Sequence, residues 1–274
     1  MTAKILSGKA VRDQILNDLM VMIKKLKRKP TLAIVLVGND PASEVYVREK
    51  EKAAAGIGID FQLIKKPSNV KQNELEEIII NLTRDKKVKG IVVQKPLPNQ
   101  IDGEKIDRLV SPEKDIDGLN PASYFHSTTA QGVVRLIKEN KIEIAGKDTV
   151  VVGRSKLSGL PTALLLLEED ATVTICHSKT RNLKEKTKQA DILVSAAGVP
   201  NLIKADMVKK GAVVIDVGTM RTKEGKIVGD VDFENVKNVA SYISPVPGGV
   251  GPMIVAGLMM NLVEASESID KQVV

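Results

Sequence analysis

A tyrosine and a lysine one helical turn apart form the first arrangement in this sequence that could perform chemistry. Tyr46 and Lys50 are spaced i and i+4 in the run 43–55, which favours a helix that Ser43 can cap. Both side chains then lie on one face of that helix. A lysine beside an aromatic ring in a partly desolvated cleft has a lowered pKa and can act as an acid or a base. A tyrosine and a lysine exposed on the helix surface, without a catalytic role, would show the same spacing.

A glutamine stands at the end of an expected strand, 90–94. Gln94 is followed by Lys95 and by two prolines, Pro96 and Pro98, which stiffen the chain. Ligands of open α/β sheets bind beyond the carboxyl ends of the strands. The amide of Gln94 could therefore hold a lysine or a substrate heteroatom, or could simply end the strand in a turn.

Two aspartates flank an isoleucine before a glycine. Asp115 and Asp117 would point to the same side if this segment were extended. Such a pair can bind Mg²⁺, but no further carboxylate cluster in the sequence supports a metal. A single aspartate that recognises a base-like heterocycle through paired donors is the simpler interpretation, and we expect no metal site.

The run 148–178 has the order strand, glycine loop, helix, strand, which presents helix N–H groups to a phosphate. Gly153 and Gly159 lie in the loop, and Pro161 opens a leucine-rich helical segment. The glycine spacing is not the G-x-G-x-x-G of dinucleotide sites, so these glycines could also just close a tight turn.

The residues after the second strand of this run bear on the choice of dinucleotide. NAD sites place an acidic residue there, whereas the 2′-phosphate of NADP needs donors and positive charge. Positions 177–181 read His-Ser-Lys-Thr-Arg, Arg154 lies on the glycine loop, and no carboxylate lies between Ala171 and Arg181. If the segment binds a nucleotide, the sequence favours NADP.

The segment 245–252, PVPGGVGP, is bounded by prolines and rich in glycine. Its glycines allow backbone to approach a ligand closely, and the helix expected after it offers free N–H groups. A purely structural turn is the alternative, but it would rarely need both features.

Alternating strands and helices must position these groups. This alternation predicts parallel βαβ units and an α/β fold. The segment 115–130 breaks the rhythm and is expected to join two domains. The expected helices cover about 7–27, 43–55, 72–84 and 253–264, and the expected strands cover 31–37, 61–65, 90–94, 149–152, 172–176, 191–195, 212–217 and 240–244.

Composition narrows the class of protein further. The chain of 274 residues contains no Trp and only three Tyr and three Phe, which argues against stacking platforms for nucleic acid despite the net charge of +7. One cysteine, Cys176, excludes an intrachain disulfide, and two histidines make a zinc site improbable. The sequence shows no signal-peptide pattern and no apolar run of membrane-spanning length, so we expect a cytoplasmic protein without a membrane or nucleic-acid partner.

Seven motifs occur in order along the chain: YVREKEKAAAGIGI (46–59), VVQKPLP (92–98), PEKDIDGLNP (112–121), VVGRS followed by Gly159 and Pro161 (151–161), CHSKT (176–180), DVG (216–218) and PGGVGPM (247–253). Together they resemble one family, the bifunctional methylenetetrahydrofolate dehydrogenase/methenyltetrahydrofolate cyclohydrolases. The resemblance spans nearly the whole chain. A different NADP-dependent reductase would explain the second half but not Tyr46, Lys50, Gln94 and Asp117 together.

The resemblance implies two α/β domains with a cleft between them, the second Rossmann-like and NADP-binding. Their expected boundaries are 1–120 with 253–274, and 121–252. By this resemblance Lys50 is the catalytic acid/base, Tyr46 stacks on the folate and Gln94 tunes the lysine. Asp117 binds the pterin ring, and it is counted with Lys50, Tyr46 and Gln94 among the catalytic residues. The remaining implied contacts are Val93, Pro247, Gly248 and Gly249 with folate, and Gly153, Arg154, Ser155, His177, Ser178 and Thr219 with NADP.

The implied reaction oxidises 5,10-methylenetetrahydrofolate with NADP⁺ and hydrolyses the resulting methenyl cation to 10-formyltetrahydrofolate. Tetrahydrofolate derivatives are thus the expected small-molecule partners, and a homodimer is the expected assembly. The chain departs from the family at three places. Its short joint ends in Ser-Thr-Thr-Ala (127–130) instead of Pro-Cys-Thr-Pro. Lys95 replaces a hydrophobic residue and adds charge near the folate site, and Ile254 replaces a threonine.

Overall fold

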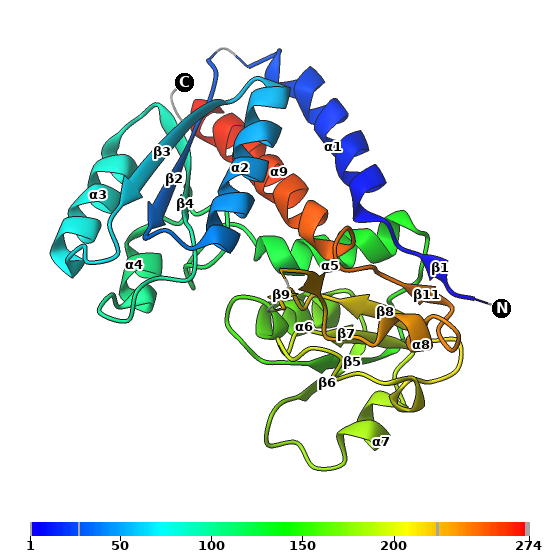
Figure 1. Ribbon diagram of the computed structural model, residues 1–274. Coiled ribbons are helices and arrows are strands. Elements are labelled where there is room, and N and C mark those ends of the chain that lie inside the picture. Colours follow the sequence, from blue (N-terminus) through cyan, green and yellow to red (C-terminus); the bar gives the residue numbers. More distant parts are fainter. Residues whose placement is uncertain (1, 27, 223–224, 272–274) are drawn as a thin grey trace. The chain divides into compact units, whose positions relative to one another are not determined.

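A computed structural model describes residues 2–26, 28–222 and 225–271. The chain forms two compact units, coloured along the sequence in Figure 1. The Lys50 unit comprises 14–128 and 255–274, and the Gly153 unit comprises 1–13 and 129–254. The expected domain boundaries stay a prediction; residues 1–13 group with the Gly153 unit because strand β1 (Lys4–Ile5) pairs with β11 (Tyr242–Ile243). Lys27, the expected end of the first helix, and residues 272–274 lie outside the described residues.

The Lys50 unit is built on a three-stranded parallel sheet of order β3-β2-β4. Its strands are β2 (Thr31–Val37), β3 (Asp60–Lys66) and β4 (Val88–Val93). The central strand β2 is almost continuously apolar because both of its faces are covered. Val93, the last residue of β4, pairs with Val35 of β2, and this register determines where β4 ends relative to β2.

Helices cover both faces of this sheet. On one face lie α3 (Gln72–Arg84) and α4 (Gly103–Leu109), and α3 buries Leu75, Ile79 and Leu82 at helical spacing. Helices α2 (Pro41–Ile57), α1 (Gly8–Ile23) and α9 (Val250–Lys271) lie on the other side of the sheet (Figure 1). Gly90 lets α9 approach, because a Cβ there would lie 2.7 Å from Leu262 Cδ1.

Helix α2, which carries Tyr46 and Lys50, has defined ends. Asp40 caps it, since Asp40 Oδ2 accepts hydrogen bonds of 2.8 Å from both Ser43 N and Ser43 Oγ. The prediction that Ser43 is the cap is therefore wrong by three residues; Pro41, which favours the first helical turn, explains the earlier start. Gly58 ends the helix with φ +85°.

The Gly153 unit contains a six-stranded parallel sheet of order β1-β11-β8-β7-β5-β6. The principal strands are β5 (Asp148–Val152), β6 (Thr172–Cys176), β7 (Ile192–Ser195) and β8 (Val213–Asp216). If β5, β6, β7, β8 and β11 are numbered 1 to 5 along the chain, the sheet read from the β6 edge has the order 2-1-3-4-5. This is a doubly wound arrangement with its switch point between β5 and β7. The predicted α/β class with a parallel Rossmann-like sheet is confirmed.

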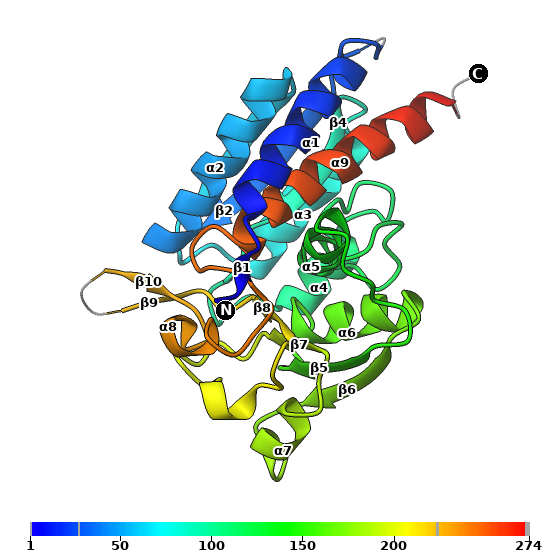
Figure 2. The same ribbon diagram turned by 90° about the vertical axis from the view of Figure 1, so that its right-hand side faces the viewer.

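Short helices and a hairpin complete this unit. Figures 1 and 2 show α5 (Thr128–Glu139) and α6 (Gly159–Glu168) on one face of the sheet, with α7 (Leu183–Thr187) and α8 (Phe233–Val236) on the other. A 3₁₀ turn (Ala205–Met207) precedes β8. The strands β9 (Met220–Arg221) and β10 (Ile227–Val228) form an antiparallel hairpin that extends from the sheet in Figure 2.

The expected long elements are present with small shifts at their ends. The expected joint at 115–130 is mostly turn, but its last residues begin α5 at Thr128. The last helix begins at Val250, three residues before its expected start, and continues to Lys271. In the described part of the chain, no helix combines the length and apolarity needed to cross a bilayer.

Candidate active site

The lysine and the glutamine that the sequence singled out meet in the Lys50 unit. Lys50 is only 6% exposed, and its Nζ donates a 2.9 Å hydrogen bond to Gln94 Oε1. Gln94 directly follows β4, and its backbone N–H donates to Val35 O at 2.9 Å. Helix α2 and the carboxyl end of β4 thus place an amine against an amide in a buried setting.

The carboxylate of Asp117 completes this cluster. Burial lowers the pKa of Lys50, because a charged amine loses hydration there, and the nearby negative charge of Asp117 partly offsets the shift. Asp117 is half-buried and accepts a hydrogen bond from the hydroxyl of Thr128 at the start of α5. Thr128 itself is 1% exposed, so this contact holds one face of the carboxylate while Lys50 lies near it.

Asp115 does not share this site. The segment is not extended: Asp115 is 3% exposed and accepts a 2.7 Å hydrogen bond from Asn120 N, which ties the turn together. Desolvation raises the pKa of Asp115 to about 6. The described residues contain no group of three or more His, Cys, Asp or Glu side chains arranged to hold a metal ion.

The other expected folate contacts are divided between the two units. Tyr46 is half-buried one turn before Lys50 on α2, and Val93 is the buried last residue of β4. The segment of Pro247, Gly248 and Gly249 belongs to the Gly153 unit, between β11 and α9. There Gly248 has φ +109° and its carbonyl accepts from Gly8 N at 2.9 Å, so this loop is fixed to the start of α1.

In the Gly153 unit, the register of the sheet brings the remaining residues to one edge. Val152 lies opposite both Cys176 and Ser195, and Ser195 lies opposite Asp216. These four strands therefore end together, and the segments that follow them start at the same edge. Those segments contain Gly153, Arg154 and Ser155 after β5, His177 and Ser178 after β6, and Thr219 after β8.

Two glycines allow a close approach of backbones at the switch point. Gly153 has φ +122°, and a Cβ on it would lie 2.2 Å from Ala196 O, on the loop after β7. A Cβ on Gly159, where α6 begins, would lie 2.3 Å from Gly153 O. Only glycine fits either position, so the loop needs these residues for its shape whether or not a phosphate binds.

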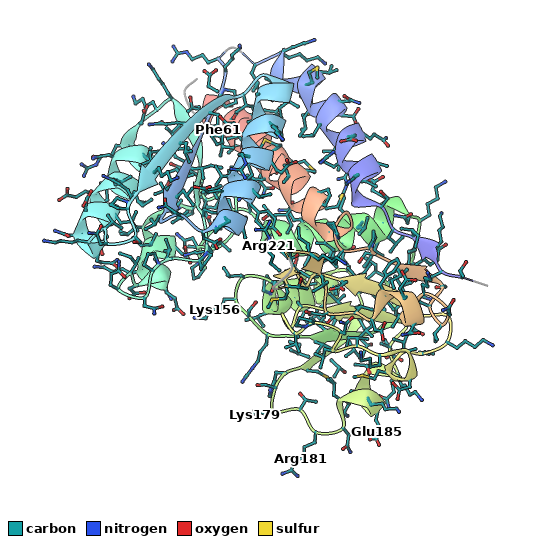
Figure 3. The ribbon with its side chains drawn as sticks, in the orientation of Figure 1. Phe61, Lys156, Lys179, Arg181, Glu185 and Arg221 are labelled. Atoms are coloured by element: carbon teal, nitrogen blue, oxygen red, sulfur yellow. The ribbon has the colours of Figure 1, made fainter. Side chains whose placement is uncertain are left out.

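The side chains at this edge are mostly exposed and polar. Arg154, Ser155 and Ser178 are exposed, and Ser155 Oγ lies 2.7 Å from Ser158 Oγ. His177 is half-buried, and its Nδ1 accepts from Lys179 N at 3.1 Å. Figure 3 shows Lys156, Lys179 and Arg181 extending from the same two loops, which makes this edge basic.

A pair of buried aspartates holds the loops after β7 and β8. Asp230 accepts from Ala197 N at 2.6 Å, from Gly198 N at 3.2 Å and from Val199 N at 2.9 Å. Asp216 accepts from Gly218 N at 2.9 Å and from Asp230 N at 3.0 Å, and desolvation raises its pKa to about 7. The loop that ends in Thr219 is therefore shaped by Asp216.

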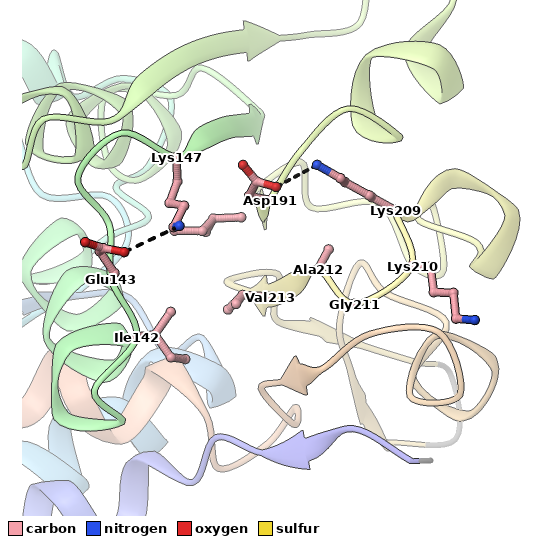
Figure 4. Close-up of a pocket in the computed structure, with 10 residues that line it drawn as sticks. Ile142, Glu143, Lys147, Asp191, Lys209, Lys210, Gly211, Ala212 and Val213 are labelled. Atoms are coloured by element: carbon pink, nitrogen blue, oxygen red, sulfur yellow. Dashed lines mark hydrogen bonds and ion pairs between the residues drawn. The ribbon is translucent and has the colours of Figure 1, made fainter.

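A separate cavity of about 220 Å³ lies at the opposite edge, where β5, β7 and β8 begin. Figure 4 shows its two ion pairs, Glu143–Lys147 at 3.5 Å and Asp191–Lys209 at 2.6 Å. Because ligands of open α/β sheets bind at the carboxyl ends of the strands, this cavity is not the candidate site.

Sequence reasoning missed three residues that shape the two sites. Thr128 could have been found, because a run of Ser and Thr before an amphipathic segment is a helix-start signal. Asp107, which pairs with Lys95, and Asp230, which holds the loop after β7, carry no local signal. Their partners lie far away along the chain or in another element.

Together, a buried Lys–Gln–Asp cluster in one α/β unit and a glycine loop at the switch point of another define a two-domain, dinucleotide-dependent enzyme of the dehydrogenase class. Two family models match the chain. Residues 6–117 match the tetrahydrofolate dehydrogenase/cyclohydrolase catalytic domain, and residues 127–270 match the NAD(P)-binding domain of the same family. The chain belongs to the tetrahydrofolate dehydrogenase/cyclohydrolase family.

Individual relatives agree with this assignment. The chain is 48% identical to the bifunctional protein FolD of Acetivibrio thermocellus, over 97% of this chain and 98% of the relative. A Campylobacter jejuni FolD structure superposes with a TM-score of 0.94 at 42% identity, covering 97% of this chain and 99% of that one. A Trypanosoma brucei FolD structure, solved with NADP and an inhibitor, gives a TM-score of 0.95 at 37% identity and covers 99% of each chain.

Proposed function

We propose that this enzyme oxidises 5,10-methylenetetrahydrofolate with NADP⁺ and hydrolyses the product to 10-formyltetrahydrofolate. The observation that carries the proposal is the buried Lys50, hydrogen-bonded to Gln94 at 2.9 Å and close to the charge of Asp117, in a chain of this family. Because burial lowers its pKa, Lys50 gives up a proton more readily than an exposed lysine does, and the hydrolysis requires a group that exchanges protons.

The residues of the Gly153 unit fit NADP. Gly153 and Gly159 let the loop after β5 pack tightly against the start of α6 and the loop after β7. The N–H groups at the start of α6 then lie at the switch point, where a phosphate can bind them. Arg154 and Ser178 supply a charge and a hydroxyl for a 2′-phosphate, and no carboxylate follows β6 before Arg181. Ser155, His177 and Thr219 would complete the contacts. When bound, NADP⁺ supplies the hydride acceptor for the methylene carbon.

The Lys50 unit would orient the folate and move protons. Asp117 would accept paired N–H donors of the pterin, and Tyr46 would stack on its ring system. Val93 and the segment 247–249 would add apolar and backbone contacts. In the hydrolysis, water forms a C–O bond to the methenyl carbon and loses one proton to Lys50 in its unprotonated form. A C–N bond then breaks and this proton passes to the leaving folate nitrogen. The second water proton is released to solvent as the hydroxyl becomes the formyl carbonyl.

Lys50→Gln tests this role, because glutamine keeps length and polarity but cannot transfer a proton. We expect cyclohydrolase activity to fall by roughly 10²- to 10⁴-fold. The assay follows hydrolysis of supplied methenyltetrahydrofolate, with thermal unfolding as the check that the variant is folded. The matched control is Lys52→Gln, a 73% exposed lysine on the same helix. Near-normal hydrolysis by a folded Lys50→Gln enzyme would contradict the assignment.

We also propose a homodimer and a cytoplasmic location. Leu164 and Leu167 on α6 are 52% and 57% exposed, and Ile175 on the neighbouring edge strand β6 is 39% exposed. This group of apolar side chains suits a second copy of the chain. Cys176 is free and buried, which is in keeping with a reducing compartment; cell fractionation tests the location.

A further inference from the structure

Lys95 is held by a partly buried ion pair next to the candidate active site. Its Nζ lies 2.7 Å from Asp107 Oδ1, and the two side chains are only 18% and 16% exposed. The same ammonium donates to Gly103 O at 3.4 Å. Both acceptors belong to α4, so the side chain of Lys95 ties the segment after β4 to that helix. Ion pairs in such positions are screened by salt less than surface pairs are.

The backbone of Lys95 determines how Gln94 presents its amide. Gln94 Nε2 donates to Lys95 O at 2.8 Å, which leaves Oε1 to accept from Lys50 at 2.9 Å. Ser43 Oγ, on α2, also donates to Lys95 O at 3.3 Å. An amide side chain has one donor end and one acceptor end. If the carbonyl of Lys95 moved, the amide could rotate and turn its NH₂ group towards Lys50, and an NH₂ group cannot accept the hydrogen bond that Lys50 donates.

Charge also connects the pair to the site. Burial raises the pKa of Asp107, Lys95 lowers it, and the negative charges of Asp117 and Glu104 raise it further. Lys50 lies within electrostatic reach of Asp117. Without Lys95, Asp107 would lose the cation that offsets its charge, while the negative charge of Asp117 would still act on it.

We propose that Lys95 and Asp107 form a positioning pair for the reaction, which fixes the orientation of Gln94 and so the hydrogen bond to Lys50. Neither residue needs to touch the substrate. The inference rests on the proposed function for its activity assay, but not for its spectroscopic assay. The proposal gives a function to Lys95, the charged residue that follows Gln94 in this chain.

The test breaks the pair from each side and then rebuilds it in reverse. Lys95→Met and Asp107→Leu each remove one partner, Lys95→Arg keeps the charge, and the double variant Lys95→Glu/Asp107→Lys exchanges the two charges. The matched control is Lys105→Met. Lys105 also lies on α4 and forms a 2.7 Å ion pair, with Glu76, but it has no contact with Gln94.

We expect each single break to lower kcat of hydrolysis by roughly 10- to 100-fold, because small displacements of catalytic groups have effects of this size, with KM changed less than threefold or so. Lys95→Arg, the exchanged pair and Lys105→Met should stay within about threefold of the parent. NADP⁺ affinity and thermal unfolding check that each variant is folded. Equal losses in Lys95→Met and Lys105→Met, or no recovery in the exchanged pair, would overturn the proposal.

A second measurement does not depend on activity. In ¹⁵N NMR spectra, the side-chain amide of Gln94 should give two distinct, exchange-protected protons in the parent, in Lys95→Arg and in the exchanged pair. These protons should lose their protection in Lys95→Met and Asp107→Leu. If the parent does not hydrolyse methenyltetrahydrofolate, the proposed function fails while the amide signals still decide the positioning role. Unchanged protection in both single variants would contradict it.

Discussion

Arg154 is the residue on which cofactor choice should depend. It is exposed on the loop after β5, beside Ser178 after β6, where a 2′-phosphate would need positive charge. Arg154→Ala should weaken NADP⁺ binding by roughly 10- to 150-fold, since a charge-assisted hydrogen bond is worth about 1.5–3 kcal/mol. NAD⁺ binding should change little. Titration of both cofactors measures this, with Arg135→Ala on α5 as the control. An equal loss for both cofactors would remove Arg154 from the 2′-phosphate role.

Asp117 should decide folate affinity. Asp117→Ala would leave the pterin donors unpaired, at a cost on the order of 1–3 kcal/mol, so the folate dissociation constant should rise about 5- to 150-fold. NADP⁺ affinity should stay unchanged. Asp117→Asn tests charge separately, and Thr128→Val removes only the hydroxyl that holds the carboxylate, so its effect should be smaller. The same folate dissociation constant for Asp117→Ala and the parent would make Asp117 a structural residue.

At the scale of elements, the loops after β7 and β8 depend on two buried carboxylates, Asp230 and Asp216, which accept hydrogen bonds from backbone N–H groups and, for Asp230, from the hydroxyl of Ser195. Desolvation raises the pKa of Asp216 to about 7 in the folded protein, against an ordinary value of 3.8. The folded state therefore binds more protons than the unfolded state between these values. The stability that Asp216 contributes is present at low pH and is lost as the pH rises through about 7.

The raised pKa of Asp216 should make the free energy of unfolding depend measurably on pH. Asp115, with a pKa near 6, has the same sign but has largely titrated above pH 6.5. Between pH 6.5 and 7.5 Asp216 passes through half-protonation, so the free energy of unfolding should fall by roughly 0.7 kcal/mol across this window, and Asp216→Asn should flatten that slope. Denaturant unfolding at several pH values measures it. A parent slope that is flat or rising, or one that Asp216→Asn leaves unchanged, would show that Asp216 is already ionised in the folded protein.

Long elements were predictable from the sequence, and contacts between distant elements were not. The apolar run of β2 and the amphipathic pattern of α3 fix strand and helix almost to the residue. Short elements such as α4 and the β9–β10 hairpin have too few residues for a periodic signal. In the site, the i,i+4 spacing of Tyr46 and Lys50 places them on one face. That Gln94 would accept from Lys50 came from its strand-end position and the family resemblance.

At the scale of the whole molecule, each unit buries its own sheet and presents polar groups at the carboxyl ends of its strands. In the Lys50 unit these are Gln94 and, beside it, Lys50 and Asp117. In the Gly153 unit they are the segments that start at Gly153 and His177. We therefore expect folate recognition by Asp117 and cofactor recognition by Arg154 to depend on separate frameworks. A substitution in one set should leave ligand affinity at the other nearly unchanged, as the Arg154 and Asp117 variants will show.

The apolar face of α6 and the edge strand β6 should form the dimer interface. Among the strands that the structure describes, β5 alone pairs with β6, so the outer backbone groups of β6 can pair with another chain. A twofold axis would bring the same face of two copies together. Leu164 and Leu167 are more than half exposed, whereas Ala163, Leu165 and Leu166 on the same helix are buried.

We expect Leu167→Glu to convert a dimer into a monomer, because a glutamate placed opposite its own copy would bury two like charges. Light scattering after size-exclusion chromatography measures the mass, which should be twice that of one chain for the parent and that of one chain for the variant. Val21→Glu on α1 is the control, since Val21 is 55% exposed but lies in the Lys50 unit. A parent that is monomeric at micromolar concentration, or a Leu167→Glu variant that stays dimeric, would place the interface elsewhere or show that none exists.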